Sequence, residues 1–138
     1  MRAWKSILLA CLAAFALAGC ASTGKQMSEL ERAQYAWSAA IRWGDFEGAW
    51  NLVDPAYRDA HPMTDLQFER YKQLQISHYR ELAASPGETE ALREIEIGVI
   101  NRHTMAERTM RYTERWRYDA AKKAWSIEGG LPDFWAGE

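Results

Sequence analysis

The chain has little cysteine and no surplus of positive charge. Only 2 of its 138 residues are cysteine, and its formal net charge is −2. Nucleic-acid binding needs a basic surface, so this charge balance argues against that class of partner. Two cysteines also cannot build the disulfide framework that stabilises many small secreted domains. We therefore expect a fold held together by its apolar core.

The sequence also lacks the common signatures of catalysis and cofactor binding. It contains no His-Glu-x-x-His, no Walker glycine loop, no dinucleotide fingerprint, no Gly-x-Ser-x-Gly and no Cys-x-x-Cys. None of the histidines, His61, His78 and His103, has a second histidine or a cysteine at metal-binding spacing. We therefore predict no metal and no cofactor, and we assign no catalytic residue.

An export signal stands at the amino terminus. Arg2 and Lys5 precede an uncharged apolar stretch over residues 7–18, which is too short to span a bilayer as a helix. Leu17-Ala18-Gly19-Cys20 follows directly. This segment resembles the lipobox of bacterial lipoproteins, in which the chain is cut between Gly19 and Cys20 and the cysteine is lipidated. The alternative is an ordinary secretory signal with a cysteine nearby by chance.

The lipoprotein resemblance implies a division of the chain. Residues 1–19 would be a signal peptide, 20–27 a lipidated tether and 28–138 a single domain. Ala21, rather than aspartate, after the cysteine implies sorting to the outer membrane, facing the periplasm. Each buried CH₂ contributes about 0.8 kcal/mol, so two or three palmitate-like chains on Cys20 would hold the protein permanently. We expect the tether to be a flexible coil reaching about 15 Å.

Helical spacing dominates the first half of the proposed domain. Ser28 and Glu31 form a capping-box pattern, and apolar residues follow it at intervals of three and four. We expect a helix from Ser28 to Gly44, a second capped by Asp45 and ended by Asp54-Pro55, an irregular segment over 56–63, and a third helix from Thr64 to about Leu74.

The apolar period changes to two in the second half, after Ser85-Pro86-Gly87. Strands are predicted over 95–99, over 110–118, where the alternation is strongest, and around Trp125 and Ile127. Residues 75–82 fit either a continued helix or a first strand. Helices followed by antiparallel strands predict an α+β fold, with helices packed on one face of a sheet of about four strands.

This order of elements, ending in Trp125-Ser126-Ile127-Glu128-Gly129, resembles the NTF2-like (cystatin-like) superfamily. Members include isomerases, cyclases, transport factors and exported lipoproteins, so the resemblance does not select one function.

Glu114 is the candidate pocket residue with the most unusual position. It lies between Tyr112 and Trp116 on the aromatic face of the strongest predicted strand. If that face met the helices, its carboxylate would be partly desolvated and could act as a general base. We favour instead a position near the end of the sheet, or a face that forms a solvated concave surface.

Two further surface features are predicted, and the first lies on the opposite face of the strand from Glu114. Arg111, Arg115 and Arg117 form a basic row, which we expect to pair across strands with Glu94 and Glu96; the alternative is a patch for an anionic partner. Most aromatic residues at helical spacing are expected in the core. The exceptions, expected to form an exposed apolar patch, are Trp43, Phe134 and Trp135.

These observations favour a membrane-anchored envelope lipoprotein whose small, non-catalytic domain binds an envelope protein or a small apolar ligand. Two alternatives stay open. One is a pocket enzyme of the isomerase or cyclase type using Glu114, and the other is an accessory subunit of an envelope complex.

Overall fold

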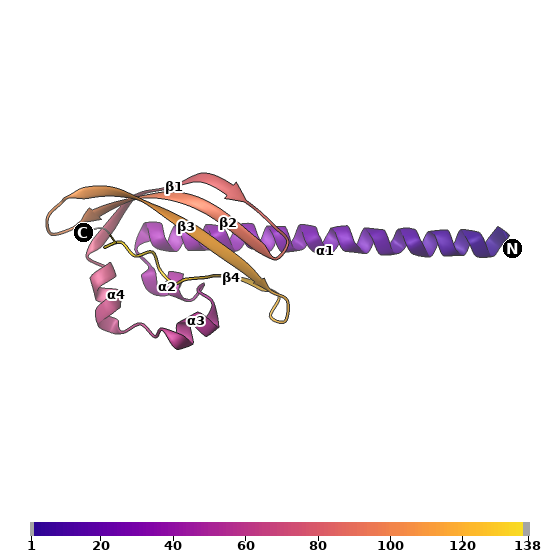
Figure 1. The fold of residues 1–138 in the computed structure, drawn as a ribbon, viewed down its shortest axis with the longest axis horizontal. Helices are drawn as coiled ribbons and strands as arrows, with labels where there is room; N and C mark the ends of the chain where they lie inside the picture. The colour runs from indigo at the N-terminus through magenta and orange to yellow at the C-terminus, as the bar shows by residue number, and fades with distance from the viewer. Residues whose placement is uncertain (1, 137–138) are drawn as a thin grey trace.

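A long helix lies along one face of a four-stranded antiparallel sheet in the computed structural model (Figure 1). The structure describes residues 2–136, and side chains from Ser22 onward. The helix, α1 (Arg2–Trp43), extends beyond the sheet at its amino-terminal end. Gly19 and Cys20 fall in that part, where side chains lie outside the described residues, so the lipobox stays a prediction. No helix in the described part of the chain is long and apolar enough to cross a bilayer.

The predicted helix start at Ser28 and the predicted coil over 20–27 are both wrong, because α1 is continuous through this segment. The Ser28 hydroxyl does not cap a helix; it donates to the carbonyl of Gly24 at 3.1 Å. Contacts with the sheet favour the helical form here. Trp125 Nε1 donates to the carbonyl of Gln26 at 3.0 Å, and Met27 packs against the core.

The carboxyl-terminal end of α1 and the starts of two short helices lie where the sequence predicted them. Gly44 has a φ of 75°, a left-handed conformation that suits the residue after a helix. The carboxylate of Asp45 accepts from the amide of Gly48 at 2.9 Å and caps α2 (Phe46–Trp50). Thr64 and Gln67 form a complete capping box at the start of α4 (Asp65–Tyr71).

The segment predicted as irregular contains a further helix, α3 (Pro55–Ala60). The predicted end of the second helix at Asp54-Pro55 is wrong, because α2 already ends at Trp50 and these two residues begin α3. Proline is favoured in the first turn of a helix, and the carboxylate of Asp54 accepts from the amide of Tyr57 at 3.2 Å. Asp54-Pro55 therefore marks the start of a helix and not the end of one.

The sheet confirms the predicted α+β class. Its strands follow chain order, and every neighbouring pair is antiparallel. Residues 75–82 belong to the first strand and do not continue a helix. The strands are β1 (Leu74–Ser85), β2 (Glu90–Asn101), β3 (Glu107–Asp119) and β4 (Ala124–Ile127).

The core lies between α1 and the sheet. Trp37 from α1 meets Trp116 from β3 edge to face, with ring centroids 6.3 Å apart. Ile95, Ile97 and Val99 from β2 are buried beside them, as their alternation predicted. These large side chains fix α1 against the sheet, because a well-filled core resists displacement.

The carboxyl-terminal segment packs on the domain, so the predicted exposed patch is wrong for its aromatic residues. Phe134 is buried against Phe46 and Tyr71, with ring centroids at 6.1 and 5.8 Å. Trp135 is half-buried, and the Arg70 guanidinium lies 4.0 Å from its ring centroid. Trp43, at the end of α1, does remain 85 % exposed.

Candidate functional site

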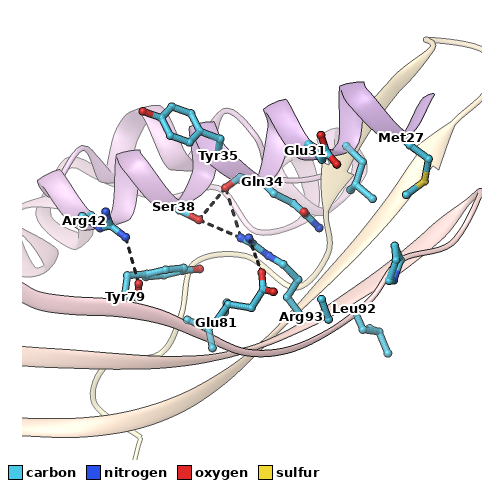
Figure 2. A pocket seen from close by; sticks show the side chains of 14 residues that line it. Met27, Glu31, Gln34, Tyr35, Ser38, Arg42, Tyr79, Glu81, Leu92 and Arg93 are labelled. Atoms are coloured by element: carbon cyan, nitrogen blue, oxygen red, sulfur yellow. Dashed lines mark hydrogen bonds and ion pairs between the residues drawn. The ribbon is translucent and has the colours of Figure 1, made fainter. Parts of the chain in front are cut away.

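A cleft of about 540 Å³ opens between α1 and the neighbouring parts of β1 and β2 (Figure 2). This volume lies in the range of small-molecule sites. Its walls combine apolar side chains such as Met27 and Leu30 with charged ones such as Arg42 and Glu81. The cleft is therefore amphipathic.

Arg93 from β2 reaches across this cleft to α1 (Figure 2). Its Nη2 donates to the Ser38 hydroxyl at 3.0 Å and contacts the Gln34 carbonyl at 3.5 Å. Its Nη1 donates to the carboxylate of Glu81 at 3.3 Å. The guanidinium thus joins the helix to two strands of the sheet, and only 12 % of the side chain is exposed.

Glu114 lies behind Arg93, with 0 % of its surface exposed. Arg93 Nε and Nη2 donate to its two carboxylate oxygens, each at 2.8 Å. Trp116 Nε1 donates to Oε2 at 2.7 Å, and the Tyr79 hydroxyl donates to Oε1. Each oxygen therefore accepts two hydrogen bonds, and the buried charge has a charged partner, as burial of a carboxylate requires.

Tyr79 extends this network to α1, since its hydroxyl accepts from Trp37 Nε1 at 3.0 Å. Burial, followed by the charge of Glu114 and the hydrogen bond to it, raises the pKa of Tyr79 far above its ordinary value. Burial and then Glu114 raise the pKa of Tyr112 as well. Burial opposes the charge on Arg93, but the hydrogen bond and charge of Glu114 prevail and raise its pKa. The phenols therefore stay neutral and the guanidinium stays charged.

The predicted pocket residues share one face of β3, but none of them lines the cleft between α1 and the sheet. Trp116 and Glu114 are buried, and Tyr112 packs against the core. The expectation of a solvated Glu114 near the sheet's end is wrong. The physical reason is that Arg93 lies directly opposite it in the register of β2 and β3 and supplies the counter-charge.

Arg93 was not among the residues predicted for the site. The sequence did indicate that Arg93 faces the core side of its strand, because Arg93 continues the two-residue alternation of Ile95 and Ile97 toward the start of the strand. Its partner could not be found in this way, since the pattern of one strand does not fix its register against the next.

The predicted pairing of the basic row is wrong as well. Arg117 pairs with Glu128, the residue after β4, at 2.9 Å, whereas Glu96 pairs with Arg80 of β1 at 2.6 Å. Arg111 lies opposite Glu96 in the register but remains exposed. The outer face of the sheet is a mixed charged surface of the kind that water solvates well.

The histidines do not gather into a site. His61 and His103 are exposed, as predicted. His78 is half-exposed on β1, with Nε2 3.5 Å from the carboxylate of Glu96, and so it does not join the buried network of Tyr79. No group of three metal-ligand side chains occurs among the residues that the structure describes.

Comparisons with known proteins support the fold and leave the function open. No protein-family model matches the chain, and no curated protein matches it. A SEC-C motif containing protein from Rhodopseudomonas palustris is 18 % identical over 67 % of this chain and 70 % of its own, with a TM-score of 0.55. At this identity the likeness concerns the fold alone.

A second solved structure, a proposed dehydratase of the NTF2-like family from Streptomyces avermitilis, covers 80 % of this chain and 99 % of its own. It is 13 % identical, with a TM-score of 0.45. This similarity is too distant to carry an argument about activity. The class that the fold defines is an α+β domain with helices packed on a four-stranded antiparallel sheet.

Proposed function

We propose that this protein is a lipid-anchored binding module of the bacterial cell envelope, with a domain of the NTF2-like type. In this proposal residues 1–19 direct export, Cys20 carries the lipid, and the protein faces the periplasm from the outer membrane. The domain binds its ligand in the cleft between α1 and the sheet and does not transform it. The sequence of the signal segment supports the anchor, and the geometry of Glu114 supports the binding role.

The burial of Glu114 is the observation that carries the binding role. A general base must come within hydrogen-bond distance of the proton that it removes. Glu114 is fully buried, and both of its oxygens already accept two hydrogen bonds from the protein. Arg93, which lines the cleft, stands between this carboxylate and any ligand there. A binding role needs only the open cleft.

Two exposed aromatic side chains favour the accessory-subunit alternative. Tyr35 and Trp43 on α1 are 77 % and 85 % exposed. Aromatic residues are enriched at protein interfaces, where they supply large contact areas. Tyr35 also lines the cleft, so a partner protein held by these residues would contact its edge.

Metabolic labelling with palmitate tests the anchor. The wild-type protein should carry the label and sediment with the membrane fraction, and Cys20→Ala should lose the label. Cys11→Ala is the matched control, since it removes the other cysteine of the chain and should keep full labelling. Persistent labelling of Cys20→Ala would contradict the proposal.

A further inference from the structure

The strand that borders the cleft, β1, is an edge strand with β2 as its neighbour. In its first half Leu74, Ile76 and Tyr79 are buried, whereas every residue of its second half, Arg80–Ser85, is exposed. An edge strand has one row of backbone N–H and C=O groups that no neighbouring strand pairs. In the part of the chain that the structure describes, no backbone group outside the sheet bonds to Arg80–Ser85. The second half of β1 therefore offers a free backbone edge to another chain.

This half of β1 is uncovered because α1 crosses the sheet from one edge strand to the other. Toward its amino-terminal end α1 contacts β4, where Trp125 Nε1 donates to the carbonyl of Gln26 at 3.0 Å. At its carboxyl-terminal end α1 contacts β1, where Arg42 Nη2 donates to the carbonyl of Tyr79 at 3.2 Å. Beyond Tyr79 the helix and the strand diverge, and the cleft lies between them (Figure 2).

The register of β1 and β2 determines which side chains of this edge face the cleft. Ala84 lies opposite Arg93, whose guanidinium reaches across the cleft to α1, so Ala84 is on the cleft side. Ala83 lies opposite Glu94 and is on the other face of the sheet. Ala84 carries a single methyl group, and Met27 on the α1 wall adds apolar surface. This part of the cleft therefore has room for a larger apolar side chain.

The charges of the cleft favour a basic group over an acidic one. Glu31 on α1 and Glu81 on β1 line opposite walls. Arg93 pairs with Glu81 at 3.3 Å but is also bound to the buried Glu114 at 2.8 Å, so one guanidinium serves two carboxylates. Arg42 is the other cationic wall residue and lies at the end of the cleft (Figure 2). Three carboxylates thus oppose two guanidinium groups, which leaves an excess of negative charge.

We infer that an extended segment of another envelope protein adds to the free edge of β1 and places alternate side chains in the cleft. Strand addition of this kind obtains affinity from main-chain hydrogen bonds and specificity from pockets for alternate side chains. The inference rests on the proposed binding role of the cleft and names the class of its ligand.

The strand geometry also defines the side chains of the added segment. Glu81 and Ala84 lie opposite Ile95 and Arg93, which are two residues apart on β2. A regular strand paired with β1 would therefore place side chains two positions apart beside them. The expected segment has an apolar residue that packs beside Ala84 and a basic residue, two positions away, that pairs with Glu81.

A synthetic peptide tests the inference on the full-length Cys20→Ala protein by isothermal titration calorimetry. The peptide repeats Thr-Leu-Thr-Lys twice, so leucine and lysine alternate on one face of the extended chain and threonine, which favours strands, occupies the other. We expect this peptide to bind and to displace the neutral fluorophore N-phenyl-1-naphthylamine from the cleft. The same peptide with glutamate in place of lysine should bind more weakly.

Methylation of the peptide backbone distinguishes strand addition from binding of side chains alone. Successive amides of an extended chain point to opposite edges. Methylating the amides of the threonines removes the donors of one edge, and methylating those of leucine and lysine removes the donors of the other. One pattern should abolish binding and the other should retain it. Equal effects of the two patterns would contradict pairing with the edge of β1.

Two adjacent alanines provide matched variants of the protein. Ala84→Phe fills the space on the cleft side of β1 and should weaken peptide binding at least tenfold. Ala83→Phe adds the same side chain on the opposite face and should leave the affinity unchanged. Equal affinities of the two variants would place the peptide elsewhere.

A charge exchange tests the basic position of the segment. Glu31→Lys should weaken binding of the lysine peptide about fivefold and strengthen binding of the glutamate peptide, since an exposed charge pair has a modest effect. Asp59→Lys makes the same change of charge at an exposed position outside the cleft and should alter neither affinity. An unchanged preference for lysine in Glu31→Lys would contradict the proposed placement of the segment.

The fluorophore separates failure of this inference from failure of the binding role. If the fluorophore binds and the unmethylated lysine peptide does not, strand addition is overturned and the binding role of the cleft stands. If neither binds, the binding role itself is refuted.

Discussion

Arg93 and Glu114 stand directly opposite each other on β2 and β3, and two guanidinium nitrogens donate to the two carboxylate oxygens at 2.8 Å. This bidentate geometry is one of the stronger forms of hydrogen bonding between charged groups. Because Glu114 is fully buried, its charge depends on this partner. The pair also connects the sheet to α1 through Ser38.

Removing one charge of this pair should be costly. Glu114→Gln keeps the shape of the side chain but removes the buried counter-charge of Arg93 and leaves only the exposed Glu81, so we expect a loss of about 3–5 kcal/mol in the free energy of unfolding. Urea denaturation measures it. Glu128→Gln removes the partner of Arg117 from an exposed ion pair and should cost about 0–1 kcal/mol. Similar losses in both variants would contradict the structural role of Glu114.

The hydroxyl of Tyr79 should stabilise the fold through two partners. Tyr79→Phe deprives Glu114 of a donor and Trp37 Nε1 of its acceptor. Each unsatisfied buried group costs about 1–3 kcal/mol, so the free energy of unfolding should fall by at least that amount. Tyr35→Phe, at an exposed position of α1, is the control and should have no measurable effect. Thermal unfolding, monitored by circular dichroism, measures the effect. An unchanged melting temperature of Tyr79→Phe would contradict this explanation.

Alkaline pH should weaken the packing of the carboxyl-terminal segment. Burial, with a smaller contribution from the charge of Asp133, raises the pKa of Tyr71 from 10.0 to about 12. Its hydroxyl donates to the carbonyl of Pro132 at 3.0 Å. The folded protein therefore keeps a proton that the unfolded chain loses above pH 10. This contribution to stability is complete below pH 10 and is lost as the pH rises toward about 12.

Tyr71→Phe should remove this part of the pH dependence. Urea denaturation of the two proteins at several pH values between neutrality and the alkaline range measures it. The wild type should lose stability more steeply than the variant above pH 10. Parallel curves would show that Tyr71 does not titrate with unfolding.

The cleft between α1 and the sheet should bind neutral apolar probes. N-phenyl-1-naphthylamine, a neutral fluorophore, should bind the protein lacking lipid, as prepared from Cys20→Ala. Adding Met27→Asp, on the α1 wall of the cleft, should weaken binding about tenfold, which corresponds to about 1.4 kcal/mol of lost contact. Adding Leu82→Asp, at an exposed position outside the cleft, should leave binding unchanged. Failure of the fluorophore to bind at all would contradict the proposed binding role.

The sequence predicted those parts of the fold that depend on local patterns. Alternation identified β3 around Glu114, and the capping pairs at Asp45 and Thr64 identified the starts of α2 and α4. A capping pattern at Ser28 failed because the preceding residues are also helical. There the contact of Gln26 with Trp125 in β4 stabilises the helix, and no local pattern reports a contact so distant in sequence.

The site was harder to predict because it depends on register. Placing Glu114 on the aromatic face of its strand was correct, but its environment is set by Arg93 on the neighbouring strand. A shift of the register by one residue would place Glu114 opposite a different side chain and leave it without this partner. Sequence spacing within either strand does not contain that information.

The unbroken run of α1 from Cys20 into the domain has a mechanical consequence. Each residue of an α-helix turns the chain by about 100° and advances it by about 1.5 Å. Inserting a single amino acid between Cys20 and Gln26, while keeping the helix, would rotate the folded domain by about 100° around the helix axis relative to Cys20. The number of residues between Cys20 and Gln26 therefore sets the orientation of the domain, about the helix axis, relative to the proposed lipid anchor.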